Sequence, residues 1–192
     1  RAMYEADILL WVGPQLEAAL ADVVNQSSSA IIHAYELTQD KGLAIPGVID
    51  PHVWLSTQNA RQIAAALAEQ LLVQDAGNYQ NYSKNLNEFN NSMNELDADI
   101  NATLEQLIDI PFAVYHNAFS YYEHQYGLVH IASYTDNEEM QPGIRKVMEV
   151  REILAANNVS CLVLEPSNNP EEISQLTGRD MDLVNIDILG FD

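Results

Sequence analysis

The sequence predicts an α/β protein in which one long helix connects two lobes with parallel sheets. Residues 78–107 have the clearest helical periodicity of the chain. At 1.5 Å per residue this helix would be roughly 45 Å long, which exceeds the diameter of a small domain. A strand–helix–strand pattern precedes it, and strands alternate with helices after residue 109. Such alternation favours right-handed crossovers and parallel strands.

The first lobe begins with a strand, a helix and a second strand. Residues 7–12 form a short apolar run that is typical of a buried strand. Gly13 and Pro14 end this run, and Pro14 suits the first turn of a helix. Residues 30–32 form the second strand. The inward face of the helix between the strands is predicted to consist of Leu16, Ala19, Leu20 and Val23.

A loop and a capped helix complete this lobe. Residues 36–51 contain glycines and prolines without any period, which indicates a loop. His52 follows the loop, and Ser56 is the expected N-cap of a helix that ends at residues 75–78. The buried face of this helix is predicted to consist of Ala60, Ile63, Ala64, Leu67 and Leu71.

The long helix that follows carries one narrow apolar stripe between polar faces. Apolar residues three and four positions apart fall on one side of a helix, so one side packs on protein and the other faces water. A coiled-coil arm is one alternative. Another is an interaction module that dimerises through Leu86, Met93 and Ile100 without metal. The apolar stripe consists of Tyr79, Tyr82, Leu86, Phe89, Met93, Leu96, Ile100, Leu104 and Leu107.

The second lobe is predicted to alternate four strands with three helices. Residues 135–139 form an acidic turn, and Pro142 begins the longest of these helices. The predicted strands are residues 112–115, 128–132, 161–164 and 183–186, and the predicted helices are residues 118–125, 142–157 and 170–176.

The composition favours a folded protein that attracts cations. The chain has 192 residues, 47% of them hydrophobic, which suffices for one large domain or two small ones. It has 28 acidic and 8 basic residues and a formal net charge of −20, which argues strongly against nucleic acid and anionic membranes as partners. A negative field raises the local concentration of cations. No apolar run reaches the ~18 residues of a membrane span.

Cys161 is the single cysteine and lies in an apolar run that is predicted to be a strand. It is either a buried small hydrophobic side chain or half of a disulfide whose partner lies outside this chain. Both interpretations stay open.

Three side chains that can ligate metal lie where an α/β fold places binding sites. His116 and Asp187 directly follow predicted strands, and ligands gather beyond the carboxyl ends of parallel strands. His52 stands at the junction between a loop and a helix. Zinc prefers imidazole nitrogen and tolerates carboxylate, whereas manganese and calcium take more oxygen ligands. His52, His116 and Asp187 therefore predict a zinc site.

The remaining histidines are expected to be ordinary polar groups. His33 ends a strand, His124 lies on the solvent side of a helix, and His130 lies in a strand. The acidic turn is expected to be a solvated face that includes Asp136, Glu138 and Glu139.

The sequence lacks the signatures of common hydrolytic sites. It has no HExxH helix, no GxSxG elbow and no phosphate-binding loop. Zinc held by histidine and aspartate can activate water, so a zinc hydrolase is kept as an alternative from another class. Because no general base is evident, we expect no catalysis.

Six segments, in this order, resemble the metal-binding solute-binding proteins of ABC importers, and most closely the zinc-uptake (ZnuA-like) receptors. The resemblance covers nearly the whole chain, and six motifs in order around a long helix are quite specific. The segments are WVGPQLE (11–17), HVWLS (52–56), HNAFSYY (116–122), QPG (141–143), LEP (164–166) and DILG (187–190).

The resemblance implies two α/β lobes joined by a rigid helix, with metal held in the cleft between them. His52 matches the second histidine ligand of the family, His116 the third, and Asp187 the acidic fourth position. Zinc-type members have histidine at the third position, whereas manganese-type members have glutamate. The first histidine ligand lies upstream of residues 11–17, so we expect a fragment whose first lobe is incomplete.

The sequence also departs from the family pattern in other places. The loop rich in histidine and acidic residues would fall between residues 36 and 50 and is absent. Asn117 stands where aspartate is common, and Ile188 stands where proline is usual. The family continues beyond the end of this chain, where it usually supplies a cysteine partner for Cys161.

The resemblance implies a periplasmic receptor that binds Zn(II) with high affinity and delivers it to an inner-membrane ABC permease. A manganese receptor or a metal-dependent adhesin on the same fold is the alternative. The expected divisions are a partial N-terminal lobe at 1–77, a linker helix at 78–108 and a C-terminal lobe at 109–192. The expected partners are the zinc ion and the permease, and a homodimer of the fragment is left open.

Overall fold

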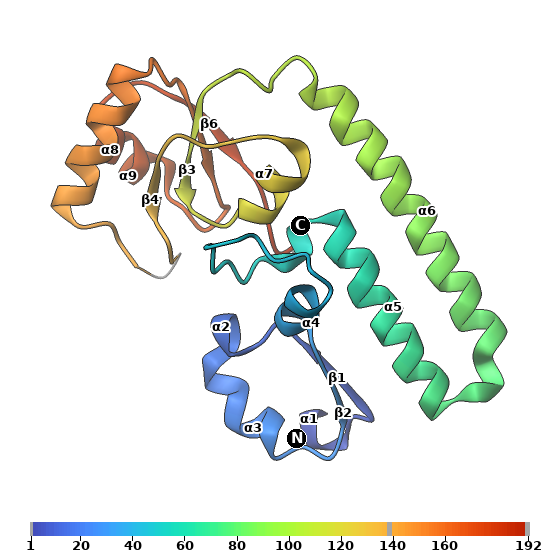
Figure 1. Cartoon of the computed structure of the whole chain (residues 1–192). Helices are drawn as coiled ribbons and strands as arrows, with labels where there is room; N and C mark the ends of the chain where they lie inside the picture. Colours follow the sequence, from blue (N-terminus) through green and yellow to red (C-terminus); the bar gives the residue numbers. More distant parts are fainter. Residues whose placement is uncertain (1, 138–139, 191–192) are drawn as a thin grey trace. The chain divides into compact units, whose positions relative to one another are not determined.

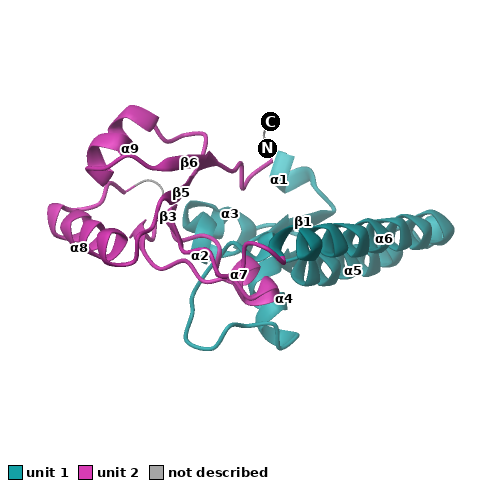
Figure 2. Ribbon diagram, turned by 90° about the horizontal axis from the view of Figure 1, so that it is seen from above, with its two compact units in different colours: residues 1–104 teal, residues 105–192 magenta. Residues whose placement is uncertain are grey.

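The computed structural model describes residues 2–137 and 140–190 of the chain, which divides into two compact units, residues 1–104 and 105–192 (Figure 2). Each unit combines parallel strands with helices, and unit 1 also contains the long helix α6 (Tyr79–Leu104). The predicted α/β class with parallel sheets and a long helix is confirmed. Among the described residues, no helix is both long enough and apolar enough to cross a bilayer.

The sheet of unit 1 consists of two parallel strands, β1 (Ile8–Trp11) and β2 (Ala30–His33). Their carboxyl ends meet at one edge, where Trp11 is opposite His33. The indole Nε1 of Trp11 donates a hydrogen bond to Nδ1 of His33 at 3.0 Å, which joins the side chains at the ends of the two strands. A short helix, α1 (Ala2–Glu5), precedes β1.

The connection between β1 and β2 is a broken helix, not the continuous helix that the sequence predicts. It consists of α2 (Pro14–Glu17), η1 (Ala18–Leu20) and α3 (Ala21–Asn25). The break occurs at Glu17, whose carboxylate accepts a hydrogen bond from the backbone N–H of Val12 at 3.0 Å. The break rotates the later turns, so Val24 is fully buried. Leu16 and Leu20, which the predicted inward face includes, are 43% and 36% exposed.

Helix α4 (Ala34–Asp40) occupies the start of the predicted loop at residues 36–51, so that part of the prediction is wrong. Its buried residues are Ala34, Tyr35 and Thr38. The helix has only two turns, too few for a helical period to stand out in the sequence. Gly42 follows it with φ +71°, a left-handed conformation that glycine adopts without strain.

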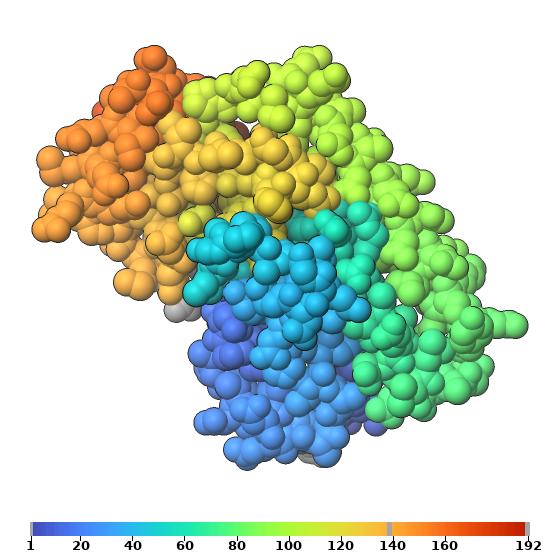
Figure 3. Space-filling model, in the orientation of Figure 1, coloured from blue at the N-terminus to red at the C-terminus, as the bar shows by residue number. Residues whose placement is uncertain are grey.

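Helices α5 (Thr57–Gln74) and α6 run side by side as antiparallel neighbours within unit 1 (Figure 1). Ser56 is the N-cap of α5, as predicted, because its hydroxyl accepts a hydrogen bond from the backbone N–H of Asn59 at 3.2 Å. The turn η3 (Ala76–Asn78) separates the two helices. In the space-filling view α6 forms a continuous exposed band (Figure 3).

Polar contacts tie the start of α5 to the second half of α6. Asp97 accepts a hydrogen bond from Arg61 at 2.8 Å and another from the hydroxyl of Thr57 at 2.5 Å. Arg61 also donates to the side-chain oxygen of Asn94 at 3.2 Å. Residues of the apolar stripe such as Met93 are half-buried. Helix α5 therefore already covers much of the surface that dimerisation through α6 would require.

Unit 2 contains one sheet of four parallel strands in the order β4–β3–β5–β6. Strand β3 is mostly buried, β5 alternates between buried and half-buried residues, and β6 lies at an edge. The strands are β3 (Phe112–His116), β4 (Ser133–Thr135), β5 (Cys161–Leu164) and β6 (Asp182–Asn185). The helices are α7 (Ser120–Tyr126), α8 (Ile144–Ala156) and α9 (Pro170–Thr177).

Strand β4 lies after the predicted strand at residues 128–132, so that prediction is wrong. Only the end of the predicted run contacts the sheet, where the backbone N–H of Ile131 donates to the carbonyl oxygen of Phe112 at 3.0 Å. Val129 in the middle of the run is 74% exposed. The strand that forms instead is polar except for Tyr134, which is 1% exposed.

The core of unit 2 lies between the sheet and helices α8 and α9. Leu162 of β5 and Leu154 of α8 are both fully buried at its centre. Arg151 fixes α8 to α9, because its guanidinium donates to the carbonyl oxygens of Leu176 and Gln175 at 2.8 Å each. These contacts satisfy two carbonyls that the end of α9 leaves without a helical partner.

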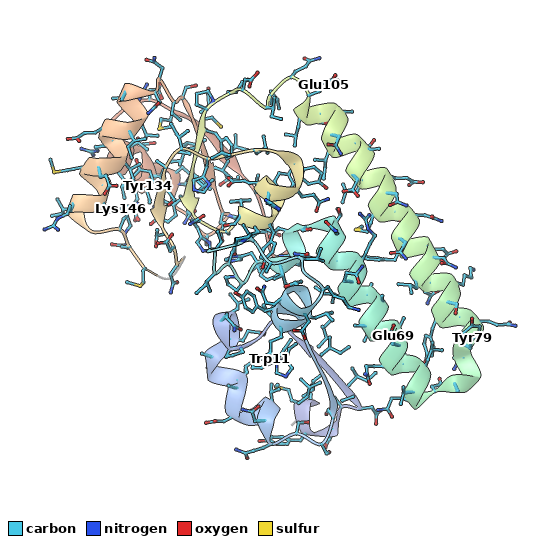
Figure 4. The ribbon with its side chains drawn as sticks, in the orientation of Figure 1. Trp11, Glu69, Tyr79, Glu105, Tyr134 and Lys146 are labelled. Atoms are coloured by element: carbon cyan, nitrogen blue, oxygen red, sulfur yellow. The ribbon has the colours of Figure 1, made fainter. Side chains whose placement is uncertain are left out.

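The hydroxyl of Tyr134 is a buried polar group that destabilises this core (Figure 4). The ring stacks on Tyr115 at a centroid distance of 6.0 Å. Among the described residues, no group forms a hydrogen bond with the buried hydroxyl. Burial raises the pKa of Tyr134 to about 12, so the hydroxyl stays protonated at any physiological pH.

Tyr134→Phe is therefore expected to leave the free energy of unfolding unchanged or to raise it by about 1 kcal/mol. An unpaired buried hydroxyl costs about 1–3 kcal/mol, and the substitution removes it without changing the packing. Tyr126→Phe is the matched control, because the buried Tyr126 hydroxyl accepts a hydrogen bond from Gln125 at 3.1 Å. Urea unfolding should show a loss for the control only. A loss of more than about 1 kcal/mol for Tyr134→Phe contradicts this account.

Candidate metal-binding site

His52 lies in unit 1, directly before the 3₁₀ helix η2 (Val53–Leu55) that leads into α5. Asn59 of α5 anchors this turn, because its side-chain nitrogen donates to the carbonyl oxygen of Val53 at 3.0 Å. Val53 and Asn59 are 0% and 1% exposed. The ring of Trp54 meets the His52 ring edge-on at a centroid distance of 5.3 Å. Helix α5 thus holds the backbone of His52 in place.

Asp50 fixes the orientation of the His52 imidazole. Its Oδ1 atom lies 2.7 Å from Nδ1 of His52 and accepts a hydrogen bond from the His52 backbone N–H at 2.9 Å. Both residues are buried. An ionised carboxylate only accepts hydrogen bonds, so Nδ1 carries the proton and the neutral ring has its lone pair on Nε2.

His116 has the same arrangement in unit 2. It is the last residue of β3, and Glu165 is the first residue after β5. The two strands are parallel with Val114 opposite Val163, so His116 and Glu165 lie level at the carboxyl edge of the sheet. Nδ1 of His116 lies 2.7 Å from Oε1 of Glu165, and both residues are buried.

These two pairs have the chemistry of metal-ligating histidines. A carboxylate on Nδ1 sets the tautomer, holds the ring plane and raises the basicity of Nε2 toward a metal ion. The strong acceptors are Asp50 in unit 1 and Glu165 in unit 2. Each unit therefore presents one imidazole that can bind a cation through neutral nitrogen.

A third pair of this kind involves His130 and Glu123. Nδ1 of His130 lies 2.7 Å from Oε1 of Glu123, which also accepts from the His130 backbone N–H at 3.1 Å. His130 lies before β4 rather than in a strand, so that prediction is wrong. Its ring is next to Phe112, the first residue of β3, at 6.5 Å. This pair therefore lies at the amino edge of the sheet, opposite His116.

The other two histidines lie where the sequence predicts, His33 at the end of β2 and His124 on the solvent side of α7. His33 accepts a hydrogen bond from Trp11 at Nδ1, so its neutral ring carries the proton on Nε2. That is the reverse of the arrangement at His52 and His116. His124 is exposed on α7.

Asp187 follows β6 at the same carboxyl edge as His116. Its Oδ1 atom accepts hydrogen bonds from the backbone N–H groups of Leu189 and Gly190 at 3.0 and 2.9 Å, which close a turn. Two strand spacings, or about 10 Å, separate the backbones of β3 and β6. Within residues 2–137 and 140–190, no three or more histidine, cysteine or acidic residues are grouped closely enough to hold a metal ion.

The carboxyl edge of β4 is polar as well. Asn117 donates from its side-chain nitrogen to Asp136 at 3.0 Å, and its backbone N–H donates to the carbonyl oxygen of Thr135 at 2.9 Å. Asp136 is exposed, as expected for the acidic turn. Glu138 and Glu139 of the predicted turn lie outside the described residues.

The protein-family comparison identifies a match over almost the whole chain. A family model described as "ZnuA: Zinc-uptake complex component A periplasmic" matches residues 1–190. The high-affinity zinc uptake system protein ZnuA of Brucella abortus is 29% identical over 125 residues, which are 65% of this chain and 37% of that protein. ZnuA of Yersinia pestis is 24% identical over 216 residues, covering 96% of this chain and 68% of that protein.

Solved structures have the same fold. Zn(II)-bound AdcAII of Streptococcus pneumoniae, an E280Q variant, superposes with a TM-score of 0.79 at 25% identity and covers 100% of this chain and 74% of that one. A crystal structure of ZnuA gives a TM-score of 0.81 at 22% identity, covering 98% and 74% of the two chains. This chain therefore spans about a third of the length of the Brucella relative and about three quarters of the solved chains.

Proposed function

The chain belongs to the ZnuA family of periplasmic zinc-uptake components, and from this membership we propose that it is a zinc receptor. It captures Zn(II) in the periplasm and delivers the ion to an inner-membrane ABC permease. No bond is made or broken, because the ion itself is the cargo. His52 of unit 1 and His116 of unit 2 are the proposed nitrogen ligands for zinc.

One observation carries this proposal: buried carboxylates hold both histidines in the tautomer that a metal ion requires. The Nδ1–carboxylate distance is 2.7 Å in each unit, to Asp50 for His52 and to Glu165 for His116. A surface histidine gains little from such a partner, and burying the carboxylates costs free energy. Such a carboxylate can orient a ligand for a cation, and the two proposed pairs differ from Glu123–His130 by following a loop or the carboxyl end of a strand.

Asp187 is proposed as an additional, weaker ligand. Its Oδ1 atom accepts two backbone hydrogen bonds, which fix the position of the carboxylate. We also keep the proposed division of the chain, with residues 78–108 as a linker helix between residues 1–77 and 109–192.

Zinc rather than manganese is the proposed cargo. Two imidazole nitrogens suit zinc, whereas manganese sites are built mainly from oxygen. The net charge of −20 attracts either cation and so does not discriminate between them.

Metal analysis after dialysis against equimolar zinc and manganese tests the proposal. We expect one zinc and no manganese per chain at neutral pH. Retention of manganese would support the manganese-receptor alternative, and retention of neither metal would contradict metal binding by this chain. Acid should release the zinc, because protons compete for the imidazole nitrogens.

The partner carboxylates should influence affinity although they do not ligate the metal. Glu165→Ala is expected to weaken zinc binding by about 10–100-fold, because the His116 ring loses both its fixed orientation and the negatively charged carboxylate that accepts a hydrogen bond from Nδ1. Glu165→Gln should weaken zinc binding less, since its amide oxygen can still accept a hydrogen bond from the Nδ1–H group of His116. Isothermal titration calorimetry measures both values.

Glu123→Ala is the matched control for this experiment. It removes an equivalent carboxylate from His130 at the opposite edge of the same sheet. Zinc affinity should stay within a factor of two of the unmodified chain. Equal losses for Glu123→Ala and Glu165→Ala would indicate that both act through folding of unit 2.

A further inference from the structure

His33 joins the two strands of unit 1 to the helix that follows them. It is the last residue of β2 and the N-cap residue of α4, and Trp11 lies opposite it at the end of β1. The Nε1–H group of Trp11 donates to Nδ1 of His33 at 3.0 Å, and the two rings meet edge-on at a centroid distance of 5.3 Å. Trp11, labelled in Figure 4, is 6% exposed. This hydrogen bond is therefore shielded on the Trp11 side and depends on a lone pair of the imidazole.

A carboxylate lies beside the same ring nitrogen. The Oε2 atom of Glu36, in the first turn of α4, is 3.8 Å from Nδ1 of His33, which is too far for a hydrogen bond. The Glu36 side chain is 61% exposed, and residues three positions apart are neighbours on a helix, so a change of rotamer can bring the two groups together. Nδ1 of His33 thus has two possible partners, an indole that only donates and a carboxylate that only accepts.

Several other titratable groups lie on the elements that pack around β1, β2 and α4. Two of them are already bound, the carboxylate of Glu17 to a backbone N–H group at 3.0 Å and Arg61 to Asp97 at 2.8 Å. The structure places Glu36 at 3.8 Å from the His33 ring, so Glu36 is the carboxylate that a protonated ring would contact. The remaining groups are Tyr35 and Asp40 on α4, Glu69 on α5 and Asp50 before η2.

A proton on Nδ1 of His33 reverses the choice of partner. A protonated imidazole donates from both nitrogens and cannot accept the N–H group of Trp11. The carboxylate of Glu36 attracts the positive ring, whereas the unpaired N–H groups at the start of α4 disfavour a positive charge there. Histidine changes its charge between about pH 5 and 8. The hydrogen bond to Trp11 is therefore present at neutral pH and is lost as the pH falls.

Helix α4 connects this contact to His52 within unit 1. The helix packs against η2, which directly follows His52, and against α5. The backbone N–H of Tyr35 donates to the carbonyl oxygen of Val12 at 2.9 Å. This bond and the hydrogen bond between Trp11 and His33 hold the start of α4 to the end of β1. Loss of one of the two bonds loosens the helix that supports η2.

We propose that His33 is a proton-sensitive positioning residue. Its neutral ring holds Trp11 and α4 in the arrangement that supports His52, and protonation moves the ring from Trp11 to Glu36. The exchange of partners occurs with or without zinc. Its effect on zinc binding rests on the proposed receptor function, and it adds to the direct competition of protons for the ligating nitrogens.

NMR of the zinc-free chain in EDTA tests the exchange of partners. In a Trp54→Phe background, the single indole N–H signal belongs to Trp11. It should move upfield between pH 7.5 and 5.0 as the hydrogen bond to His33 is lost. His33→Asn should keep the signal in place, because the Asn Oδ1 atom stands at the position of Nδ1, accepts the same bond and does not titrate. An unmoved signal in the Trp54→Phe chain overturns the proposal, as does an equal shift after His33→Asn.

Glu36→Gln tests the second partner. The midpoint of the Trp11 signal shift should move to lower pH, because the protonated ring loses the negative charge that favours it. Asp40→Asn is the matched control, since it removes a carboxylate from the other end of α4. The control should leave the midpoint unchanged. Equal displacement by both substitutions overturns the assignment of Glu36 as the partner.

Zinc competition titrations at pH 7.5 and 6.0 test the connection to His52. Protons compete for the zinc ligands equally in the unmodified chain and in His33→Asn, so the difference between the two chains isolates His33. The unmodified chain should lose about fivefold more affinity than His33→Asn, which corresponds to the loss of one hydrogen bond. Equal losses overturn the connection to His52. Absence of zinc binding by both chains at pH 7.5 contradicts the receptor function, and the Trp11 signal still decides the exchange of partners.

Discussion

Replacement of His116 by alanine is expected to reduce zinc affinity by at least about 100-fold. Loss of a carboxylate that only orients a ligand costs about 10–100-fold, so loss of the ligand itself must cost at least as much as the upper value. His116 contributes one of the two proposed nitrogen ligands, and its carboxylate partner Glu165 would be left buried without the imidazole. Competition with a chromophoric chelator measures the change.

His52→Ala should produce a loss of similar size, although His52 lies in the other unit. His130→Ala is the control, since it deletes a histidine with the same carboxylate contact of 2.7 Å but at the amino edge of the sheet. Its zinc affinity should not change. An unchanged affinity for His116→Ala would remove His116 from the site, and an equal loss for His130→Ala would attribute the effect to folding.

Leu162→Ala is expected to lower the free energy of unfolding of unit 2 by about 2–5 kcal/mol. Leu162 is fully buried in β5, between the neighbouring strands β3 and β6, and it contributes to the core that α8 and α9 cover. Truncation leaves a cavity that the rigid sheet cannot close. Differential scanning calorimetry measures the shift in the unfolding transition.

Ile144→Ala serves as the comparison, because Ile144 is 82% exposed at the start of α8. It should change the free energy of unfolding by less than about 0.5 kcal/mol.

Both tryptophans, Trp11 and Trp54, belong to unit 1. If the units unfold independently, Leu162→Ala should leave the tryptophan fluorescence transition in place. If Leu162→Ala lowered the free energy of unfolding by less than about 1 kcal/mol, Leu162 would not be central to the core.

The long and strongly patterned elements were predictable from the sequence. Apolar periodicity predicts helix α6, and a continuous apolar run predicts strand β5. Ser56 predicts the start of α5 because serine is a favourable N-cap residue. Short elements with polar residues were not predictable. Helix α4 has two turns, and β4 has only Tyr134 to show its burial, so tertiary contacts rather than local pattern decide both.

The candidate site was predictable only in part. His52, His116 and Asp187 are recognisable from residue type and from their position after strands or loops. The roles of Asp50 and Glu165 were not deduced. Glu165 is 49 residues away from His116 in sequence, and only the pairing of β3 with β5 brings them to 2.7 Å. Asp50 lies two residues before His52, and its proximity could have suggested the contact.

The contacts of Asp97 imply that the segment bearing His52 is ordered before a cation binds. They join α6 to the first turn of α5, and Asn59 joins that turn to the segment that bears His52. Backbone amides of this whole assembly should open as one cooperative unit in hydrogen exchange, with no separate early-exchanging segment at residues 52–55. The imidazole is then in position before any cation arrives, so capture does not incur the entropic cost of ordering a disordered turn.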